Sequence, residues 1–404
     1  MKKICLFTNS FPYGKLSETF LEDEILVASK LDVNIVVIPL RYHKESRTLL
    51  YPNVSVCDKL MNFGLKKKIE ALFEMFFSKY FWYLPFVAKR PKTPKEFYQG
   101  VKYLYGSFLV KRFVCLYHDL FNDIDIFYSY WFNHTPLGLY WAKQTEKKLK
   151  HVPIYTRAHG FDVYERAVGT FFPYRNYTLS GLEAVYVVSN TGCKYLKKSY
   201  PEFSNKIRVA KLGVLPVEYR RKNKEGVVTF ISCSSVIPLK RVDLIYECIN
   251  CYSKKYPEIE VCWMHIGGGI SFEHLSQCIQ DKATNLKVTL YGAVSNKKVK
   301  EIYRDYSFDI FINLSTSEGI PVAIMEAISN GIPVIATNVG GTKEIVTQDT
   351  GILLSVDFSQ KEFQQAVGYI FGHYDLYMDS TIRFYENNFN AIINYDYFYN
   401  MELL

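Results

Sequence analysis

The chain has 404 residues, of which 49% are hydrophobic and 22% are charged, and its formal net charge is +9. This composition excludes a disordered chain, and the length exceeds what one hydrophobic core usually holds, so we expect two domains. Nine scattered cysteines and the lack of a long apolar run argue against a disulfide-rich secreted protein and an integral membrane protein. We therefore expect a cytoplasmic protein with free thiols.

The first half of the chain alternates short apolar runs with longer amphipathic segments, the pattern of a parallel sheet with helices on both faces. The apolar runs predict strands at 4–8, 34–39, 124–130, 153–157 and 184–188. The segments between them predict helices at 17–30, 65–82, 95–118, 135–148 and 191–199. Ligands of such sheets bind at the carboxyl ends of the strands.

A polar, charged stretch at 219–226 interrupts this rhythm and predicts a linker. The alternation then restarts, with strands expected at 227–233, 261–266, 287–291, 310–314, 333–336 and 351–354. We predict two doubly wound α/β units in tandem with a cleft between them. The expected domains are 1–215 and 216–380, and the aromatic-rich segment 381–404 is expected to pack across their junction.

The excess of positive charge lies in the N-terminal half, where residues 1–200 carry 29 Lys and Arg against 17 Asp and Glu. One stretch mixes these cations with aromatic side chains, namely Lys66, Lys67, Lys68, Lys79, Lys89, Arg90, Lys92 and Lys95 with Phe73, Phe76, Phe77, Tyr80, Phe81, Trp82, Tyr83 and Phe86. Such a mixture suits an anionic lipid surface. The alternative is an ordinary buried helix pair with a solvated basic edge. Nucleic acid is not an expected partner, because no recognised binding motif accompanies the charge.

Three loops of the second half follow predicted strands and carry residues that suit a phosphate ligand. Lys240 and Arg241 suit a diphosphate, although a solvated pair beside Asp243 would give the same pattern. Gly267 would let the backbone approach a ligand closely, or it simply makes a turn. Glu318 follows a third strand. Because the carboxyl ends of parallel strands meet at one edge, we expect these loops to share one rim.

The stretch from Gly319 to Thr342 contains a single charged side chain, Glu326, among apolar and small residues. Glu318 and Glu326 bracket a predicted helix start, with Pro321 in its first turn. The free N–H groups and the dipole of such a start favour phosphate, whereas an unpaired buried carboxylate would cost several kcal/mol, roughly. The segment therefore predicts a ligand with both phosphate and hydroxyl groups.

The same segment resembles the nucleotide-sugar site of retaining glycosyltransferases of family 4. The resemblance runs through Ser317-Glu318-Gly319-Ile320-Pro321, Glu326-Ala327, Gly331-Ile332-Pro333-Val334-Ile335-Ala336-Thr337 and Gly340-Gly341. The N-terminal half is similar to the family in Phe11-Pro12-Tyr13-Gly14 with Ser17-Glu18-Thr19-Phe20, in Arg157-Ala158-His159-Gly160 and in Leu212-Gly213-Val214. The resemblance implies the GT-B fold, in which two Rossmann-like domains face across a cleft and a C-terminal helix packs back across the junction.

The resemblance also implies roles for individual residues. Glu318 and His159 would act at the transferred sugar from the two domains, and Glu326 would accept hydrogen bonds from the ribose. Lys240 would neutralise the phosphates, with Arg241 as a helper, since the preceding loop lacks the arginine that many members carry there. The donor-binding residues would further include Gly319, Ile320 and Pro321 at the distal phosphate, Gly14 in a covering loop and Gly267.

The implied reaction is transfer of a hexose from a UDP- or GDP-sugar to a glycan or lipid-linked acceptor, with retained configuration, in surface polysaccharide biosynthesis. Lys240 and a helix N-terminus would stabilise the departing diphosphate, so neither a metal nor another cofactor is expected. Asp123 and Asp125 resemble the metal motif of the other major glycosyltransferase fold, but they open a predicted strand, so we expect a strand-edge acid pair. The expected location is the cytoplasm, with peripheral contact at the inner face of the membrane.

Two other functions fit the same pattern of residues. A nucleotide-sugar epimerase or hydrolase could use the same two-domain cleft, and it would consume the donor without any acceptor. A non-catalytic nucleotide-sugar binding protein would bind the donor but never turn it over.

Overall fold

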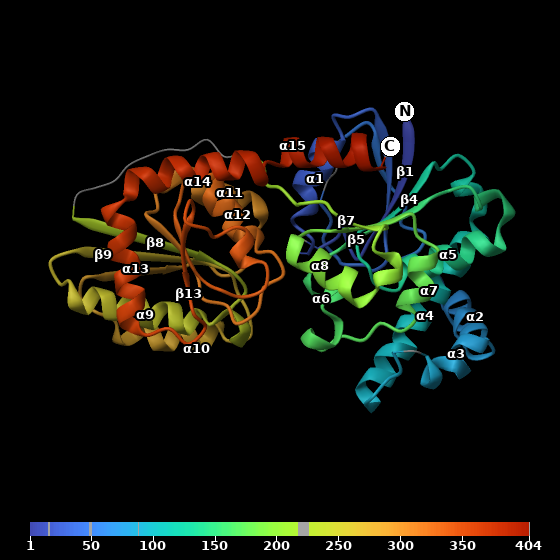
Figure 1. Ribbon diagram of the computed structural model, residues 1–404, viewed down its shortest axis with the longest axis horizontal. Coiled ribbons are helices and arrows are strands. Elements are labelled where there is room, and N and C mark those ends of the chain that lie inside the picture. The colour runs from blue at the N-terminus through green and yellow to red at the C-terminus, as the bar shows by residue number, and fades with distance from the viewer. Residues whose placement is uncertain (15–16, 48–50, 88, 217–225, 404) are drawn as a thin grey trace. The chain divides into compact units, whose positions relative to one another are not determined.

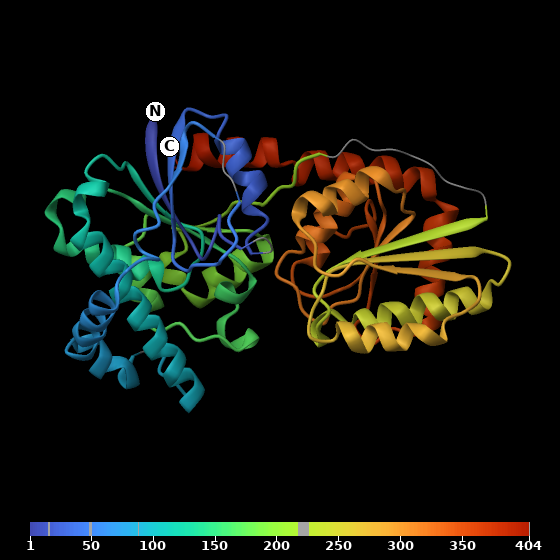
Figure 2. The same ribbon diagram turned by 180° about the vertical axis from the view of Figure 1, so that it is seen from behind.

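A computed structural model describes residues 1–14, 17–47, 51–87, 89–216 and 226–403 of the chain (Figures 1 and 2). The chain divides into a first unit, Met1–Lys211 with Tyr395–Leu404, and a second unit, Leu212–Asn394. Each unit is built on a parallel sheet with helices, which confirms the predicted fold class of two Rossmann-like α/β units. The stretch predicted as a linker, 219–226, lies outside the described residues except for Gly226.

The described residues of the first unit form a seven-stranded parallel sheet in the order β3-β2-β1-β4-β5-β6-β7. Its strands are β1 (Lys2–Thr8), β2 (Val33–Pro39), β3 (Val54–Val56), β4 (Ile126–Ser129), β5 (Ile154–Ala158), β6 (Ala184–Val187) and β7 (Ile207–Val209). The strand order reverses between β1 and β4, because β2 and β3 add on one side of β1 and β4 to β7 on the other. Ligands of open α/β sheets bind beside such a switch point.

Helices flank this sheet, and local sequence explains where several of them begin. Thr93 caps the long α4, because its hydroxyl accepts the Glu96 N–H at 3.1 Å and Pro94 opens the first turn. Ser189 caps α8 in the same way. The helices are α1 (Leu21–Ala28), α2 (Leu65–Phe76), α3 (Lys79–Tyr83), α4 (Pro94–Leu116), α5 (Thr135–Thr145), α6 (Gly160–Val163), α7 (Arg175–Ser180) and α8 (Asn190–Ser199).

The described residues of the second unit form a six-stranded parallel sheet in the order β10-β9-β8-β11-β12-β13, which reverses between β8 and β11. Its strands are β8 (Val227–Cys233), β9 (Glu260–Ile266), β10 (Leu286–Leu290), β11 (Ile310–Asn313), β12 (Val334–Thr337) and β13 (Gly351–Leu354). Trp263, Ile310 and Ile335 are at most 1% exposed and belong to one apolar core with Phe363.

Helices cover both faces of this second sheet, as Figure 2 shows. The α11 helix buries Val299, Ile302 and Tyr303, which lie three and four residues apart and therefore share one face. A capping box formed by Ser359 and Glu362 starts α13. The helices are α9 (Val242–Lys255), α10 (Phe272–Cys278), α11 (Asn296–Asp305), α12 (Val322–Ser329), α13 (Gln360–Gly372) and α14 (Tyr374–Asn388).

The end of the chain belongs to the first unit from Tyr395 onward, a residue within the short helix α15 (Ala391–Tyr397). The Phe398 ring packs against the Tyr128 ring at 5.5 Å, and the Tyr399 hydroxyl donates to the buried Glu24 carboxylate at 3.3 Å. Glu24 also lies 3.7 Å from the buried Arg157 guanidinium. The last residues of the chain therefore add a hydrogen bond to the buried Glu24–Arg157 pair of the first unit.

The predicted elements differ from the observed ones in several places, and the short helices α6 and α7 were not predicted at all. The edge strands β3 and β7 were not predicted, because each has only three residues and exposes polar side chains. The helix expected at 65–82 is two helices, since the backbone at Ser78 is extended and its hydroxyl caps α3. The helix expected at 17–30 begins only at Leu21, because the backbone of Glu18 is left-handed with φ 51°.

Candidate functional site

The two loops that flank the switch point of the second sheet meet through a charged pair. Lys240 follows β8 and Glu318 follows β11, and the Lys240 Nζ lies 2.6 Å from the Glu318 Oε1. The side chains are 21% and 8% exposed, respectively, so the bond is only partly shielded from water. The predicted convergence of these two loops is therefore present in the structure, at the edge where α/β sheets bind ligands.

The Glu318 carboxylate is held by neutral groups as well as by the lysine. Asn313 Nδ2 donates to Oε1 at 3.2 Å, and Ser315 Oγ lies 2.6 Å from the same atom. Within the described residues, Oε2 receives no hydrogen bond, and Lys240 still has two ammonium protons to offer. The Glu318 carboxylate is therefore held in place and can still accept a hydrogen bond from a ligand. The Lys240 ammonium can still donate hydrogen bonds to the same ligand.

The segment after Glu318 leads into the N-terminus of α12 and is supported by two glycines. The Gly341 N–H donates to the Gly319 carbonyl at 2.9 Å. Gly340 has φ 51°, and a Cβ there would lie only 1.8 Å from the Glu318 carbonyl oxygen. The loop after β12 thus fixes the backbone of Glu318, and only glycine fits there. Pro321 is the residue just before α12 rather than part of its first turn, which corrects the prediction by one position.

Glu326 lies on α12, is half-buried and is near enough to Cys233, the last residue of β8, for its charge to act on that thiol. Burial raises the pKa of the Cys233 thiol at that strand end, and the Glu326 charge adds to the rise. Burial likewise raises the pKa of Tyr303 on α11, with Cys233 and Glu326 contributing. The second acid of the predicted pair therefore lies at the same edge of the sheet as the first.

Arg241 has a contact that the sequence did not predict. Its Nε donates to the Leu314 carbonyl at 2.6 Å, and its Nη1 donates to the Val356 carbonyl at 2.9 Å. Its backbone is left-handed, with φ 47°. The Arg241 guanidinium thus links the ends of β11 and β13 and stabilises their arrangement. Lys240, in contrast, contacts the Glu318 carboxylate.

Gly267 is explained by backbone packing. A Cβ at this position would lie 1.8 Å from the Ser234 carbonyl oxygen, and φ is 141°. The loops after β8 and β9 are joined here by hydrogen bonds from Ser234 N to Ile266 O and from Val236 N to Gly268 O, each of 2.9 Å. Of the two interpretations from the sequence, the tight turn therefore has structural support.

Gly14 and His159 belong to the first unit. Gly14 has φ 81°, and its N–H donates to the Glu45 carbonyl at 2.5 Å. The His159 ring lies 4.4 Å from the Trp131 ring, and neither of its buried ring nitrogens has a hydrogen-bond partner in the described part of the chain. Burial, assisted by the Arg157 charge, holds the pKa of His159 well below its usual value. The ring is therefore neutral and has unused hydrogen-bonding capacity.

One structural role of Glu18 was missed. Its carboxylate accepts the backbone N–H groups of Asn9, Ser10 and Phe11 at 2.9, 2.6 and 2.7 Å. It also accepts the indole N–H of Trp131 at 2.5 Å. The loop after β1 is thus wrapped around the Glu18 carboxylate. In the sequence, the only sign of this role is that Glu18 lies soon after a predicted strand.

The described part of the chain has neither a metal-binding cluster nor a membrane-spanning helix. In the described ranges, no three His, Cys, Asp or Glu side chains are grouped to hold a metal ion. Asp123 and Asp125 both contact Lys3, at 2.6 Å to its Nζ and 2.8 Å to its backbone N. None of the described helices combines the length and the hydrophobicity needed to cross a bilayer.

Comparison with known proteins relates the second unit to a family. Residues 218–379, less than half of the chain, match the family model described as "Glycosyl transferases group 1". The match falls within the second unit, Leu212–Asn394. This match and the names of similar proteins support a transferase of the glycosyltransferase class.

Two curated relatives illustrate the similarity. A phosphatidylinositol N-acetylglucosaminyltransferase component from Arabidopsis thaliana is 28% identical over 132 residues, which cover 32% of this chain and 28% of that protein. The O-antigen biosynthesis glycosyltransferase WbnH of Escherichia coli is 30% identical over 170 residues, covering 42% and 45%. The chain thus spans less than half the length of each of these relatives.

Solved structures extend the similarity of fold to both units. A glycosyltransferase from Rickettsia africae has a TM-score of 0.66 at 17% identity, with coverage of 100% of this chain and 97% of that chain. Anabaena HepE, solved with UDP and glucose, has a TM-score of 0.62 at 13% identity, with 98% of each chain covered. At these identities the likeness is one of fold, and the fold is GT-B.

Proposed function

We propose that the chain is a retaining glycosyltransferase of family 4 that transfers a hexose from a UDP- or GDP-sugar to a glycan or lipid-linked acceptor in surface polysaccharide biosynthesis. The observation that carries the proposal is the Lys240–Glu318 pair at the switch point of a group 1 domain. Glu326 at the same edge completes the acid pair of the motif. HepE, solved with UDP and glucose, supports a donor of this kind.

The proposed chemistry follows from where charge develops. When the glycosyl–phosphate bond breaks, negative charge builds on the departing diphosphate and positive charge on the sugar. Lys240 and the N–H groups that begin α12 would stabilise the diphosphate, so the proposed reaction requires no metal or other cofactor. Glu318 would hold the hydroxyls of the sugar, and Glu326 those of the ribose. Arg241 would help only by holding Lys240 and β11 in place.

Two groups of the first unit are proposed to act on the donor. His159 would donate a hydrogen bond to the sugar, which its neutral ring and unpaired nitrogens support. Gly14 lies in the loop proposed to cover the donor, a loop that Glu18 organises through three backbone N–H groups.

We also propose peripheral contact with the inner face of an anionic membrane, in the cytoplasm. We define the aromatic–basic segment as residues 64–98. Of α2 only Ala71 and Met75 are buried, and α3 buries none of its residues, which supports this proposal over the alternative of an ordinary buried helix pair. Its exposed side chains include Phe73, Phe77, Trp82, Tyr83 and Phe86, each at least 58% exposed. Nine free thiols support a reducing compartment.

The donor site is tested by calorimetric titration of UDP, GDP and ADP, each with its hexose conjugates, in the presence of a chelator. We expect one nucleotide to bind without metal. Glu326→Gln and Lys240→Met should each weaken it about tenfold or more, because a hydrogen bond to a charged group contributes roughly 1.5–3 kcal/mol.

Matched controls are Glu258→Gln and Lys254→Met, two exposed positions of the second unit between the C-terminal end of α9 and the start of β9. Their titrations should match that of the wild type. Failure of every nucleotide to bind would contradict the proposed donor site. Consumption of the donor without any acceptor would favour an epimerase or hydrolase, and binding without turnover a binding protein.

A further inference from the structure

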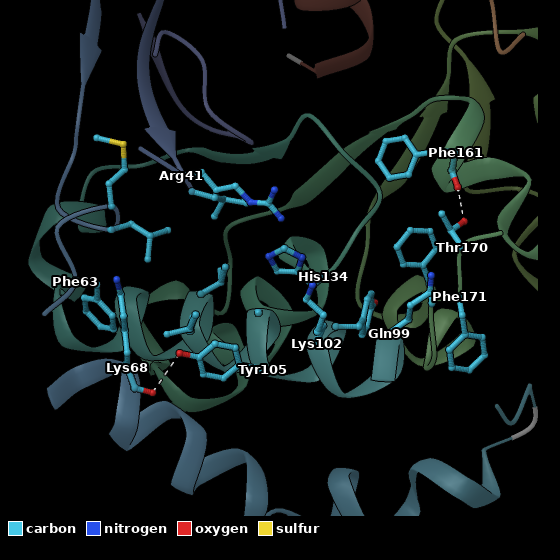
Figure 3. Close-up of a pocket in the computed structure, with 18 residues that line it drawn as sticks. Arg41, Phe63, Lys68, Gln99, Lys102, Tyr105, His134, Phe161, Thr170 and Phe171 are labelled. Atoms are coloured by element: carbon cyan, nitrogen blue, oxygen red, sulfur yellow. Dashed lines mark hydrogen bonds between the residues drawn. The ribbon is translucent and has the colours of Figure 1, made fainter. Parts of the chain in front are cut away.

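The first unit contains a cavity of about 570 Å³ that the donor site does not use (Figure 3). It is lined by residues that follow four strands at their carboxyl ends: Arg41 after β2, Phe63 after β3, His134 after β4 and Phe161 after β5. These loops lie on both sides of β1, so the cavity spans the switch point of the first sheet. Position and volume are those of a ligand site.

The charged side chains that line the cavity are all positive. They are Arg41, Lys68 and Lys102, and the described lining contains no Asp or Glu. Within the described residues, none of these three cations forms an ion pair. Two acids of α2 are already neutralised elsewhere, since Glu70 pairs with Arg112 and Glu74 with Lys111. The cavity is therefore an unneutralised positive site, which favours an anionic ligand.

The rest of the wall is largely apolar. Leu109 and Val110 of α4 face it, together with the aromatic rings of Phe63, Phe161 and Phe171. In Figure 3 the labelled Arg41, His134 and Lys102 occupy the middle of the cavity, with Phe63 at one end and Phe161 and Phe171 at the other. A ligand that fills this cavity would need an apolar part next to its charged group.

His134 supplies a neutral polar group among these cations. Burial, with a smaller contribution from the charge of Arg41, lowers the pKa of His134 to about 4. Gly106 makes room for it, since a Cβ on α4 there would lie 2.4 Å from a ring carbon. A neutral imidazole can donate one hydrogen bond to an oxygen without adding charge.

We infer that this cavity binds a phosphorylated lipid, with the phosphate between Arg41, Lys102 and His134 and the first part of the chain along the apolar wall. Three cations suit the charge of a phosphate monoester, which is about −1.5 to −2 near neutral pH, better than the single charge of a carboxylate. A free inorganic anion is a poor fit to this cavity, because the apolar side chains of the wall would have nothing to contact.

This inference rests on the proposed function and gives it an acceptor class, a lipid that carries a phosphate monoester. Lys68 supports the link to a membrane, because it lines the cavity and lies on α2 of the aromatic–basic segment.

The test is calorimetric titration of the full chain with three probes: octyl phosphate, octyl glucoside and inorganic phosphate, each below its micellar concentration where one exists. We expect octyl phosphate to bind at least about tenfold more tightly than either of the others, because only it offers both charge and chain. Equal binding of octyl glucoside would overturn the role of the cations, and equal binding of inorganic phosphate would overturn the role of the apolar wall.

Variants locate the binding. Arg41→Gln combined with Lys102→Gln should weaken octyl phosphate about tenfold or more, and both side chains are exposed, so folding should persist. The matched control, Lys197→Gln with Lys198→Gln, removes two exposed cations of α8 and should change nothing. Leu109→Ser should weaken octyl phosphate but not inorganic phosphate. No binding, or binding that these variants leave unchanged, would overturn the inference.

The outcome is independent of the donor site. Nucleotide titration of the Arg41/Lys102 variant should reproduce the wild type, because both residues belong to the first unit and the phosphate-binding residues proposed for the donor belong to the second. Loss of octyl phosphate binding with intact nucleotide binding would support the cavity. Intact octyl phosphate binding with no nucleotide binding would instead overturn the proposed donor site alone.

Discussion

At the scale of single residues, Lys240 and Glu318 hold each other in the position that a diphosphate sugar would occupy. The 2.6 Å bond keeps a carboxylate beside the end of β11, where Asn313 and Ser315 also bind it. A diphosphate that approached Lys240 would be repelled by Glu318 unless the sugar hydroxyls engaged that acid. The pair therefore favours a nucleotide that carries a sugar over the same nucleotide without one.

A second residue-scale feature is a buried histidine, His265, in the core of the second unit. Trp263 Nε1 donates to Ser232 Oγ at 3.0 Å, which leaves the serine hydroxyl to donate to His265 Nδ1 at 2.8 Å. The ring is then neutral, with its proton on Nε2. Burial lowers the pKa of His265 to about 4, and the Ser234 carbonyl offsets only part of that shift.

We predict that this histidine makes stability depend on pH. Its folded pKa lies below the unfolded value of about 6.5, so its stabilisation is complete above pH 6.5 and is lost as the pH falls toward 4. The loss would reach about 3 kcal/mol, since one pKa unit corresponds to roughly 1.4 kcal/mol. Urea unfolding across this range should show a smaller loss for His265→Gln than for the wild type.

The control is His373→Gln, an exposed histidine of the same unit. It should show the same pH dependence as the wild type. Equal losses for His265→Gln and the wild type would mean that the buried ring does not set the acid limit of stability.

Residue positions were predictable where one strand-end motif carries the chemistry. Glu318 and Lys240 were both expected, because each follows a strand and the strand ends share an edge. The bracing role of Arg241 was not, since it depends on the Leu314 and Val356 carbonyls, which are remote in sequence. No local pattern specifies such contacts.

At the scale of elements, α2 and α3 are the parts of the first unit that the apolar core leaves most exposed. The Phe73 and Phe77 rings stack on each other at 6.4 Å, outside the core, and are 58% and 77% exposed. Lys89 is separate from this surface, because its ammonium lies 3.8 Å from the Tyr200 ring centroid. The exposed surface that remains carries both aromatic and basic side chains, as interfacial helices do.

We predict that these helices bind anionic vesicles. In co-sedimentation, Lys66→Glu with Lys79→Glu should lower partitioning at least about tenfold, because each lysine near the surface contributes roughly 1 kcal/mol. Phe77→Ser with Trp82→Ser should lower it as well, through lost apolar contact. Neutral vesicles should bind poorly.

Leu376→Ser with Lys361→Glu serves as the matched control, since both side chains are exposed on helices of the second unit. It should partition like the wild type. Unchanged partitioning of the α2–α3 variants would contradict the membrane contact.

Buried strands and capped helices were the most predictable elements. β8 and β13 have the expected bounds, because buried parallel strands form short continuous apolar runs. β3 and β7 escaped prediction because edge strands carry mixed side chains and depend on a neighbour for pairing. The break at Ser78 was hidden by the aromatic residues around it, which fit a helix equally well.

At the scale of the whole molecule, two parallel sheets each present a switch point with a different set of side chains. The second sheet presents a lysine, two carboxylates and a helix N-terminus, which suit a nucleotide sugar. The first presents cations on an apolar wall, which suit a phosphorylated lipid. In the proposed function, the donor and the acceptor are therefore recognised by separate units.

The measurement that tests this most directly is hydrogen exchange of the full chain, read by mass spectrometry, with and without UDP-, GDP- and ADP-sugars. We predict that one of them slows exchange at residues 236–242, 315–322 and 338–342, the loops around Lys240, Glu318 and Gly340, and that Lys240→Met abolishes this protection. Exchange unchanged in these loops with every nucleotide sugar, or slowed only elsewhere, would contradict the central claim.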